Sequence, residues 1–172
     1  LDINEHIINS KSYKISFNQK NITNIAGTVY LDSSNCSLMF FNNQIRYDSN
    51  FKTIIINKES LEILNKSTNQ IFIENLQKEL KTLLPSINIL DLLKDSKLKV
   101  SKNDTSYYFE SDNYGTYKIY FLNNNMNRLE ILYNNIEIIL SDINFSIIDS
   151  IEIFNYFIIE NDSSTTFDLR FE

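Results

Sequence analysis

Short apolar runs, rich in aromatic and β-branched residues, alternate with polar knots along most of this chain, and this alternation constrains its fold more than any other feature. Runs of about five to eight such residues are typical of β-strands, and polar knots at short intervals are typical of hairpin turns. The sequence therefore predicts an antiparallel meander, with strands over Tyr13–Gln19, Ile25–Leu31, Ser37–Phe41, Gln44–Tyr47, Lys52–Ile56, Leu61–Leu64, Gln70–Glu74, Lys97–Lys102, Thr105–Ser111, Gly115–Leu122, Arg128–Tyr133, Ile136–Phe145, Phe154–Ile159 and Thr166–Phe171.

Asparagine marks most of the predicted turns, as in Asn42-Asn43, Ser67-Thr68-Asn69 and Asn134-Asn135. Tight hairpins need residues with positive φ, and the chain has only two glycines to supply them. Asparagine is the next best residue there, because its side chain bonds the local backbone and tolerates the left-handed region. We therefore expect asparagines to shape the hairpins.

The segment Leu76–Asp95 interrupts the strand pattern and predicts two helices. Leucines at helical spacing run from Leu76 to Leu84, and Pro85 ends this first helix. Ser86 can cap a second helix, and a third is expected over Ile3–Asn9. Helices this few and this apolar should pack on one face of a single sheet.

Several strands carry apolar residues on both faces for part of their length, as in Tyr117–Leu122 and Ile136–Leu140. Either a helix covers the outer face of such strands, or the sheet is strongly curved and its concave face lines a cavity. The expected fold class is α+β: a strongly curved antiparallel sheet, an incomplete β-barrel, with two or three helices covering the opening. At 172 residues, one domain should span residues 1–172.

The composition argues against most chemistry. A net charge of −6 does not suit nucleic acid, which needs a clustered basic surface. One histidine, His6, and one cysteine, Cys36, are too few for a catalytic triad or a zinc site. Two glycines exclude phosphate-cradling loops. We therefore expect no enzymatic activity, no cofactor and no bound metal.

Two stretches carry a resemblance to a known family. The strand Phe17-Asn18-Gln19 is followed by Gly27-Thr28-Val29-Tyr30-Leu31, and Leu61–Gln70 places Asn65 five residues before Gln70. In this order the motifs resemble LolA, the periplasmic lipoprotein carrier family. The sequence departs from the family pattern at Ser33-Ser34, where an Arg-Pro pair is usual. The family's arginine is held to latch its lid helices to the barrel, and Arg46 is a candidate substitute.

The resemblance implies a monomeric periplasmic carrier whose signal peptide has been removed, a boundary that would fit the start at Leu1. Such a carrier takes lipidated proteins from an inner-membrane ABC-type release complex and passes them toward the outer membrane, where a receptor can accept them. The alternatives are an outer-membrane lipoprotein receptor (LolB-like), another amphiphile-binding module of the same fold, or a structural or adhesive β-protein with a packed interior and no cavity.

The residues expected to line the lipid-binding cavity come from the sheet and from the predicted lid helices. They are Val29, Leu31, Leu38, Phe40, Ile54, Ile63, Ile89, Leu90, Leu93, Tyr117, Ile119 and Phe121.

Overall fold

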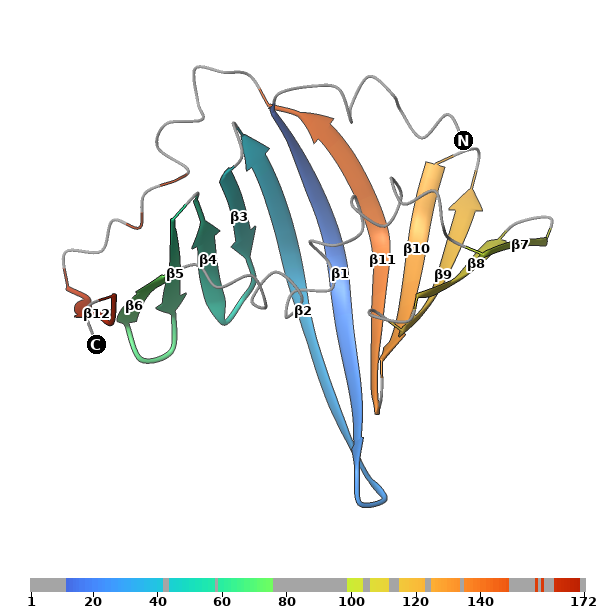
Figure 1. Cartoon of the computed structure of the whole chain (residues 1–172), viewed down its shortest axis with the longest axis horizontal. Helices are drawn as coiled ribbons and strands as arrows, with labels where there is room; N and C mark the ends of the chain where they lie inside the picture. Colours follow the sequence, from blue (N-terminus) through green and yellow to red (C-terminus); the bar gives the residue numbers. More distant parts are fainter. Residues whose placement is uncertain are drawn as a thin grey trace. The chain divides into compact units, whose positions relative to one another are not determined.

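The described part of the chain forms one open, mixed sheet of twelve strands (Figure 1). The strand order is β12-β6-β5-β4-β3-β2-β1-β11-β10-β9-β8-β7. The computed structural model describes residues 12–41, 44–57, 59–75, 99–103, 106–111, 115–122, 125–133, 135–148, 157, 159 and 163–170.

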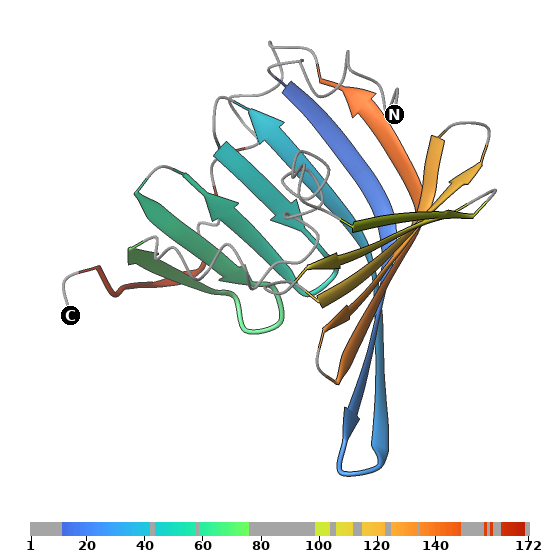
Figure 2. The ribbon, with the colours of Figure 1, turned by 45° about the vertical axis from the view of Figure 1, so that its right-hand side comes forward.

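The two longest strands, β1 (Ser12–Ile25) and β2 (Thr28–Phe41), form one hairpin, drawn in blue in Figure 2. The residues between the two strands are Ala26 and Gly27. Both turn residues have positive φ, 50° and 85°, which is the geometry that a tight hairpin needs. The side-chain Oδ1 of Asn24 accepts a hydrogen bond from the Gly27 amide at 3.2 Å. The predicted strand Ile25–Leu31 is therefore wrong, because the chain reverses within it.

Four shorter strands follow β2 as consecutive antiparallel hairpins: β3 (Gln44–Asp48), β4 (Lys52–Ile56), β5 (Ser60–Asn65) and β6 (Gln70–Asn75). Asparagines shape these turns as expected. The Asn57 carboxamide accepts hydrogen bonds from the amides of Glu59 and Ser60, and Asn65 does the same for Ser67. Asn69 adopts a φ of 54°.

The remaining antiparallel strands are β7 (Lys99–Asn103), β8 (Ser106–Ser111), β9 (Gly115–Leu122), β10 (Asn125–Tyr133) and β11 (Ile136–Ile147). The last strand, β12 (Thr165–Asp168), runs parallel to β6, with Phe167 opposite Phe72. Their rings stack with centroids 5.2 Å apart.

The expected α+β class with a purely antiparallel sheet is wrong for the described residues. These residues are almost entirely β-structure, and no helix lies among them. The helices predicted within Leu76–Asp95 and over Ile3–Asn9 fall outside the described residues. The parallel pair was missed because it joins segments far apart in sequence, and no local turn announces such a pairing.

The chain divides into two compact units. The first comprises Leu1–Ile3, Phe17–Ser34 and Lys78–Asn144, and the second comprises Asn4–Ser16, Asn35–Gln77 and Phe145–Glu172. In the first unit, β9, β10 and β11 bury one apolar face, on which Tyr117, Ile119, Leu129, Ile131 and Leu140 are at most 1% exposed. In the second unit, strands β2 to β6 bury residues on both faces, such as Leu38 on one and Ile55 on the other.

Candidate functional site

A continuous apolar row crosses six strands of the second unit. Pairing places Leu38 opposite Tyr47, Tyr47 opposite Ile54 and Ile54 opposite Ile63. The row continues through Phe72 to Phe167. Residues directly opposite one another share a face of the sheet, so these side chains form one surface. A second row on the same face runs from Phe40 through Ile45 and Ile56 to Leu61, and we call the two rows together the apolar face.

Four of the residues predicted to line a cavity lie together on this apolar face. Leu38 and Ile54 are buried, while Phe40 and Ile63 are half-buried. The Phe40 ring also stacks on Tyr13 of β1, with centroids 4.6 Å apart. The sequence predicts Leu38, Phe40, Ile54 and Ile63 as lining residues, and the strand register places all four on one side of the sheet.

Three other predicted residues share the buried face of the first unit. Tyr117 and Ile119 of β9 lie opposite Ile131 and Leu129 of β10. Phe121, on the same strand, is half-buried beside an irregularity in the register between Met126 and Arg128. The opposite face of these strands is polar, and there Tyr120 donates a hydrogen bond to Glu130 at 3.0 Å.

Two of the other predicted lining residues, Val29 and Leu31, are exposed. Val29 and Leu31 are 57% and 65% exposed, on the part of β2 that belongs to the first unit. Ile89, Leu90 and Leu93 lie outside the described residues. The role of the whole set in binding lipid therefore stays a prediction.

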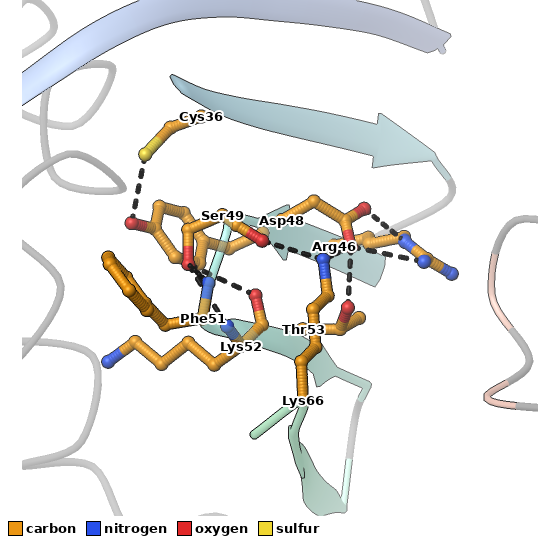
Figure 3. Close-up of polar contacts among 9 residues, drawn as sticks. Cys36, Arg46, Asp48, Ser49, Phe51, Lys52, Thr53 and Lys66 are labelled. Carbon is orange, nitrogen blue, oxygen red and sulfur yellow. Dashed lines mark hydrogen bonds and ion pairs between the residues drawn. The ribbon is translucent and has the colours of Figure 1, made fainter. Parts of the chain in front are cut away.

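A polar cluster occupies the face of the second unit opposite the apolar face (Figure 3). Asp48 accepts hydrogen bonds from Arg46 Nε at 2.5 Å and from Thr53 Oγ1 at 2.6 Å. Lys66 Nζ lies 3.8 Å from the same carboxylate and donates to the Ser49 carbonyl at 2.6 Å. Sequence reasoning missed this cluster, although Arg46 and Asp48 are two positions apart in a strand and so share a face.

The electrostatics of this cluster favour an ionised Asp48. Burial alone would raise the pKa of Asp48, but hydrogen bonds from Arg46 and Thr53 and the charges of Arg46 and Lys66 lower it below its usual value. Arg46, the candidate substitute for the family's latch arginine, points to the face opposite Ile45 and Tyr47. There it forms an ion pair with Asp48 of its own strand.

Cys36 is buried, with its sulfur 3.2 Å from the Tyr47 hydroxyl. Among the side chains that the structure places, no three His, Cys, Asp or Glu residues are grouped to hold a metal ion. Within the same ranges, no helix has the length and hydropathy needed to cross a membrane.

Comparison with known proteins places the fold. No family model matches the sequence, and no curated protein is significantly similar to it. An uncharacterized conserved protein from Thermus thermophilus has a similar structure, with a TM-score of 0.59 at 9% identity over 97% of both chains. This chain therefore shares the fold of that protein.

Two further solved structures carry names. One is a LolA superfamily protein from Nitrosomonas europaea, with a TM-score of 0.41 and 11% identity over 82% of this chain and 88% of that one. The other is a putative outer membrane lipoprotein-sorting protein domain from Vibrio parahaemolyticus, with a TM-score of 0.42 and 6% identity over 86% and 90%. The first of these two proteins carries the name of the family that the sequence motifs resemble.

Proposed function

We propose that this chain is a periplasmic carrier that binds the acyl chains of lipidated proteins and moves them from the inner to the outer membrane. The observation that carries the proposal is the shared face of Leu38, Phe40, Ile54 and Ile63, which register aligns across β2, β4 and β5. The motifs Gly27–Leu31 and Leu61–Gln70 supply the link to lipoproteins.

The physical requirement is an apolar surface that competes with water for a hydrocarbon chain. Each acyl CH₂ removed from water contributes about 0.8 kcal/mol, so a lipid anchor needs a long row of apolar side chains. The row from Leu38 to Phe167 extends across six strands. The ion pair of Arg46 with Asp48 lies on the opposite face, so it does not interrupt this row.

The test uses two neighbouring residues of β5. Ile63 lies on the apolar face and Leu64 on the other, and both are half-buried. In the carrier, a hydrophobic fluorescent probe binds stoichiometrically; Ile63→Asp should lower its affinity at least about tenfold, because a charge beside the hydrocarbon must be desolvated. Leu64→Asp is the matched control and should leave probe affinity within about twofold.

Two results would contradict the proposal. A parent protein that binds no probe has a packed interior, as expected for the structural or adhesive alternative. Equal loss of probe affinity in Ile63→Asp and Leu64→Asp, with equal loss of thermal stability, would show that both act through folding alone. Thermal unfolding of each variant, followed by circular dichroism, separates the two cases.

The partners follow from the same proposal. A carrier of this kind receives its cargo from an inner-membrane ABC-type release complex and gives it up to an outer-membrane receptor. It needs no cofactor or catalytic residue, because the free energy of transfer comes from the apolar surfaces that the acyl chains leave and enter. Co-purification of lipidated proteins, lost on removal of their acyl chains, would support it.

A further inference from the structure

The first half of β2 presents an unusual free edge. Strand β3 pairs with β2 only from Ser37 to Phe41, so among the described strands nothing pairs with Thr28–Ser33 on that side (Figure 1). We call Thr28–Ser33 the free edge. A strand edge of this kind displays unpaired amide and carbonyl groups, which can accept another strand.

The free edge is also exposed on both of its faces. Val29, Tyr30 and Leu31 are 57%, 57% and 65% exposed, although successive residues of a strand point to opposite faces. All six residues from Thr28 to Ser33 are exposed, and Asp32 is the only charged one. Long, apolar, uncharged edges are usually avoided, so an edge of this composition needs a partner.

The chemistry of the free edge selects a strand over a lipid surface. Lipid could cover the apolar side chains of Val29, Tyr30 and Leu31, but it offers nothing to the unpaired backbone groups, which are costly to leave unmet in hydrocarbon. An added β-strand satisfies the backbone and the side chains together. The structure therefore points to recognition of an extended strand.

The sequence of the free edge then points to its own copy. When two copies run antiparallel with Tyr30 opposite Tyr30, Val29 lies opposite Leu31 of the second copy, and Thr28 lies opposite Asp32. Apolar residues then meet apolar residues, and a hydroxyl meets the carboxylate. The two Asp32 residues are about 13 Å apart, beyond the screening length at physiological salt.

We propose that two copies of this chain associate through their free edges, paired antiparallel about Tyr30. Five or six residue pairs bury less surface than the roughly 1,200 Å² of stable complexes. The dimer is therefore weak and reversible, and it forms at high local concentration. This replaces the expectation of a strict monomer and stands apart from lipid binding.

The first test exploits the two-fold axis, which places each Tyr30 against its own copy. Tyr30→Lys and Tyr30→Glu should each raise the dimer dissociation constant at least about tenfold, because like charges then lie directly opposite. An equimolar mixture of the two variants should associate again. Sedimentation equilibrium at up to millimolar protein measures this, and circular dichroism confirms that each variant is folded.

The second test is disulfide trapping. Directly opposed Cα atoms in an antiparallel pair are about 4.5–5.5 Å apart, which suits a disulfide. Tyr30→Cys should therefore give a covalent dimer under mild oxidation. The matched control is Leu132→Cys, 52% exposed on β10, which has β9 and β11 on its two sides. The parent, whose Cys36 is buried, gives the background.

Three results would overturn the proposal. The parent could stay monomeric at millimolar concentration, or the mixture of the two variants could fail to associate. Disulfide trapping could also be equal in Tyr30→Cys and Leu132→Cys. If the monomer binds phosphatidylcholine–phosphatidylglycerol vesicles, and both Tyr30→Lys and Tyr30→Glu lose this binding, the free edge contacts a lipid surface instead.

Discussion

Asp48 and Asp168 each pair with an arginine two positions away, but they differ in their exposure to water. Asp48 is half-buried and bonded to Arg46 and Thr53, whereas Asp168 is exposed and bonded to Arg170, which lowers the pKa of Asp168 to about 2. Solvent screens the exposed pair, so a low pKa there need not mean a large contribution to stability. The two aspartates form a matched comparison.

Asp48→Asn should lower the free energy of unfolding at pH 7 by about 1–2 kcal/mol, because it removes a charged hydrogen-bond acceptor from a partly shielded site. The pKa of Asp48 is lowered in the folded state, so its contribution is present above the ordinary value of 3.8 and is lost as pH falls through the lowered pKa. The difference between the parent and variant stabilities should therefore begin to shrink below about pH 4 and vanish only below the lowered pKa. Urea unfolding across pH 3–7 measures this.

Asp168→Asn is the control and should change the stability little at any pH in that range. If Asp168→Asn costs as much as Asp48→Asn, burial is not what distinguishes the two sites.

At the residue scale, the sequence identified part of the apolar face and missed its polar counterpart. Leu38, Phe40, Ile54 and Ile63 share a face as apolar alternation within each strand suggested. The hydrogen bond from Thr53 to Asp48 and the ion pair of Lys66 with Asp48 join residues of different segments, so they depend on register. Register is set by turns and packing, which single positions do not reveal.

The hairpin of β1 and β2 depends on a turn with an unfavourable residue. Ala26 has a φ of 50°, a region where a Cβ costs about 1 kcal/mol, whereas asparagine and glycine are tolerated. Ala26→Asn should therefore stabilise the hairpin by about 0.5–1 kcal/mol. Gly27→Ala should destabilise it through φ alone, because nothing lies within 4 Å of the added methyl group. Amide hydrogen exchange in β1 and β2 reports both changes; faster exchange in Ala26→Asn would show that this turn is not the one formed.

Strand β12 is held to the edge of β6 by an aromatic pair. Phe167 stacks on Phe72, and the Leu169 amide donates to the Ile73 carbonyl at 2.8 Å. Phe167→Ala should weaken this docking by about 1 kcal/mol, since an aromatic cross-strand pair is lost. Thr166→Ala, on the opposite face of β12, should not. The rate of limited proteolysis after residue 160 compares the two variants. Equal cleavage rates in Phe167→Ala and Thr166→Ala would show that the Phe167–Phe72 stack does not hold β12 to β6.

At the element scale, the sequence located most strands but not the longest hairpin. Apolar residues on either side of Ala26-Gly27 looked like one continuous strand, because Ile25, Val29 and Leu31 have no polar knot between them. The turn there forms at Ala26 and Gly27, which both have positive φ, and one polar side chain, Asn24, accepts a hydrogen bond from the Gly27 amide. The turn at Ser67-Thr68-Asn69, which does carry a polar signal, was predicted correctly.

At the scale of the whole molecule, the strand order depends on pairings that no local signal specifies. Strand β1 lies beside β11, and β6 lies beside β12. These partners are separated by most of the chain, so local hairpin rules cannot predict them. Such non-local pairing is slow to form, because the loops must close before the contacts stabilise them. The meander within β2 to β6 was predictable because each of its strands pairs with the next.

The carrier proposal makes its last prediction for the whole protein in its host. Depleting the protein should leave lipidated proteins in the inner membrane, since without an apolar surface in transit their acyl chains cannot cross the aqueous periplasm. Re-expressed Leu64→Asp should restore outer-membrane delivery, whereas Ile63→Asp should not, although both residues are half-buried neighbours on β5. Membrane fractionation after depletion measures the distribution. Normal delivery in fully depleted cells that have no second copy of the gene would exclude the carrier role. Rescue by Ile63→Asp would show that the apolar face is not where the acyl chains bind.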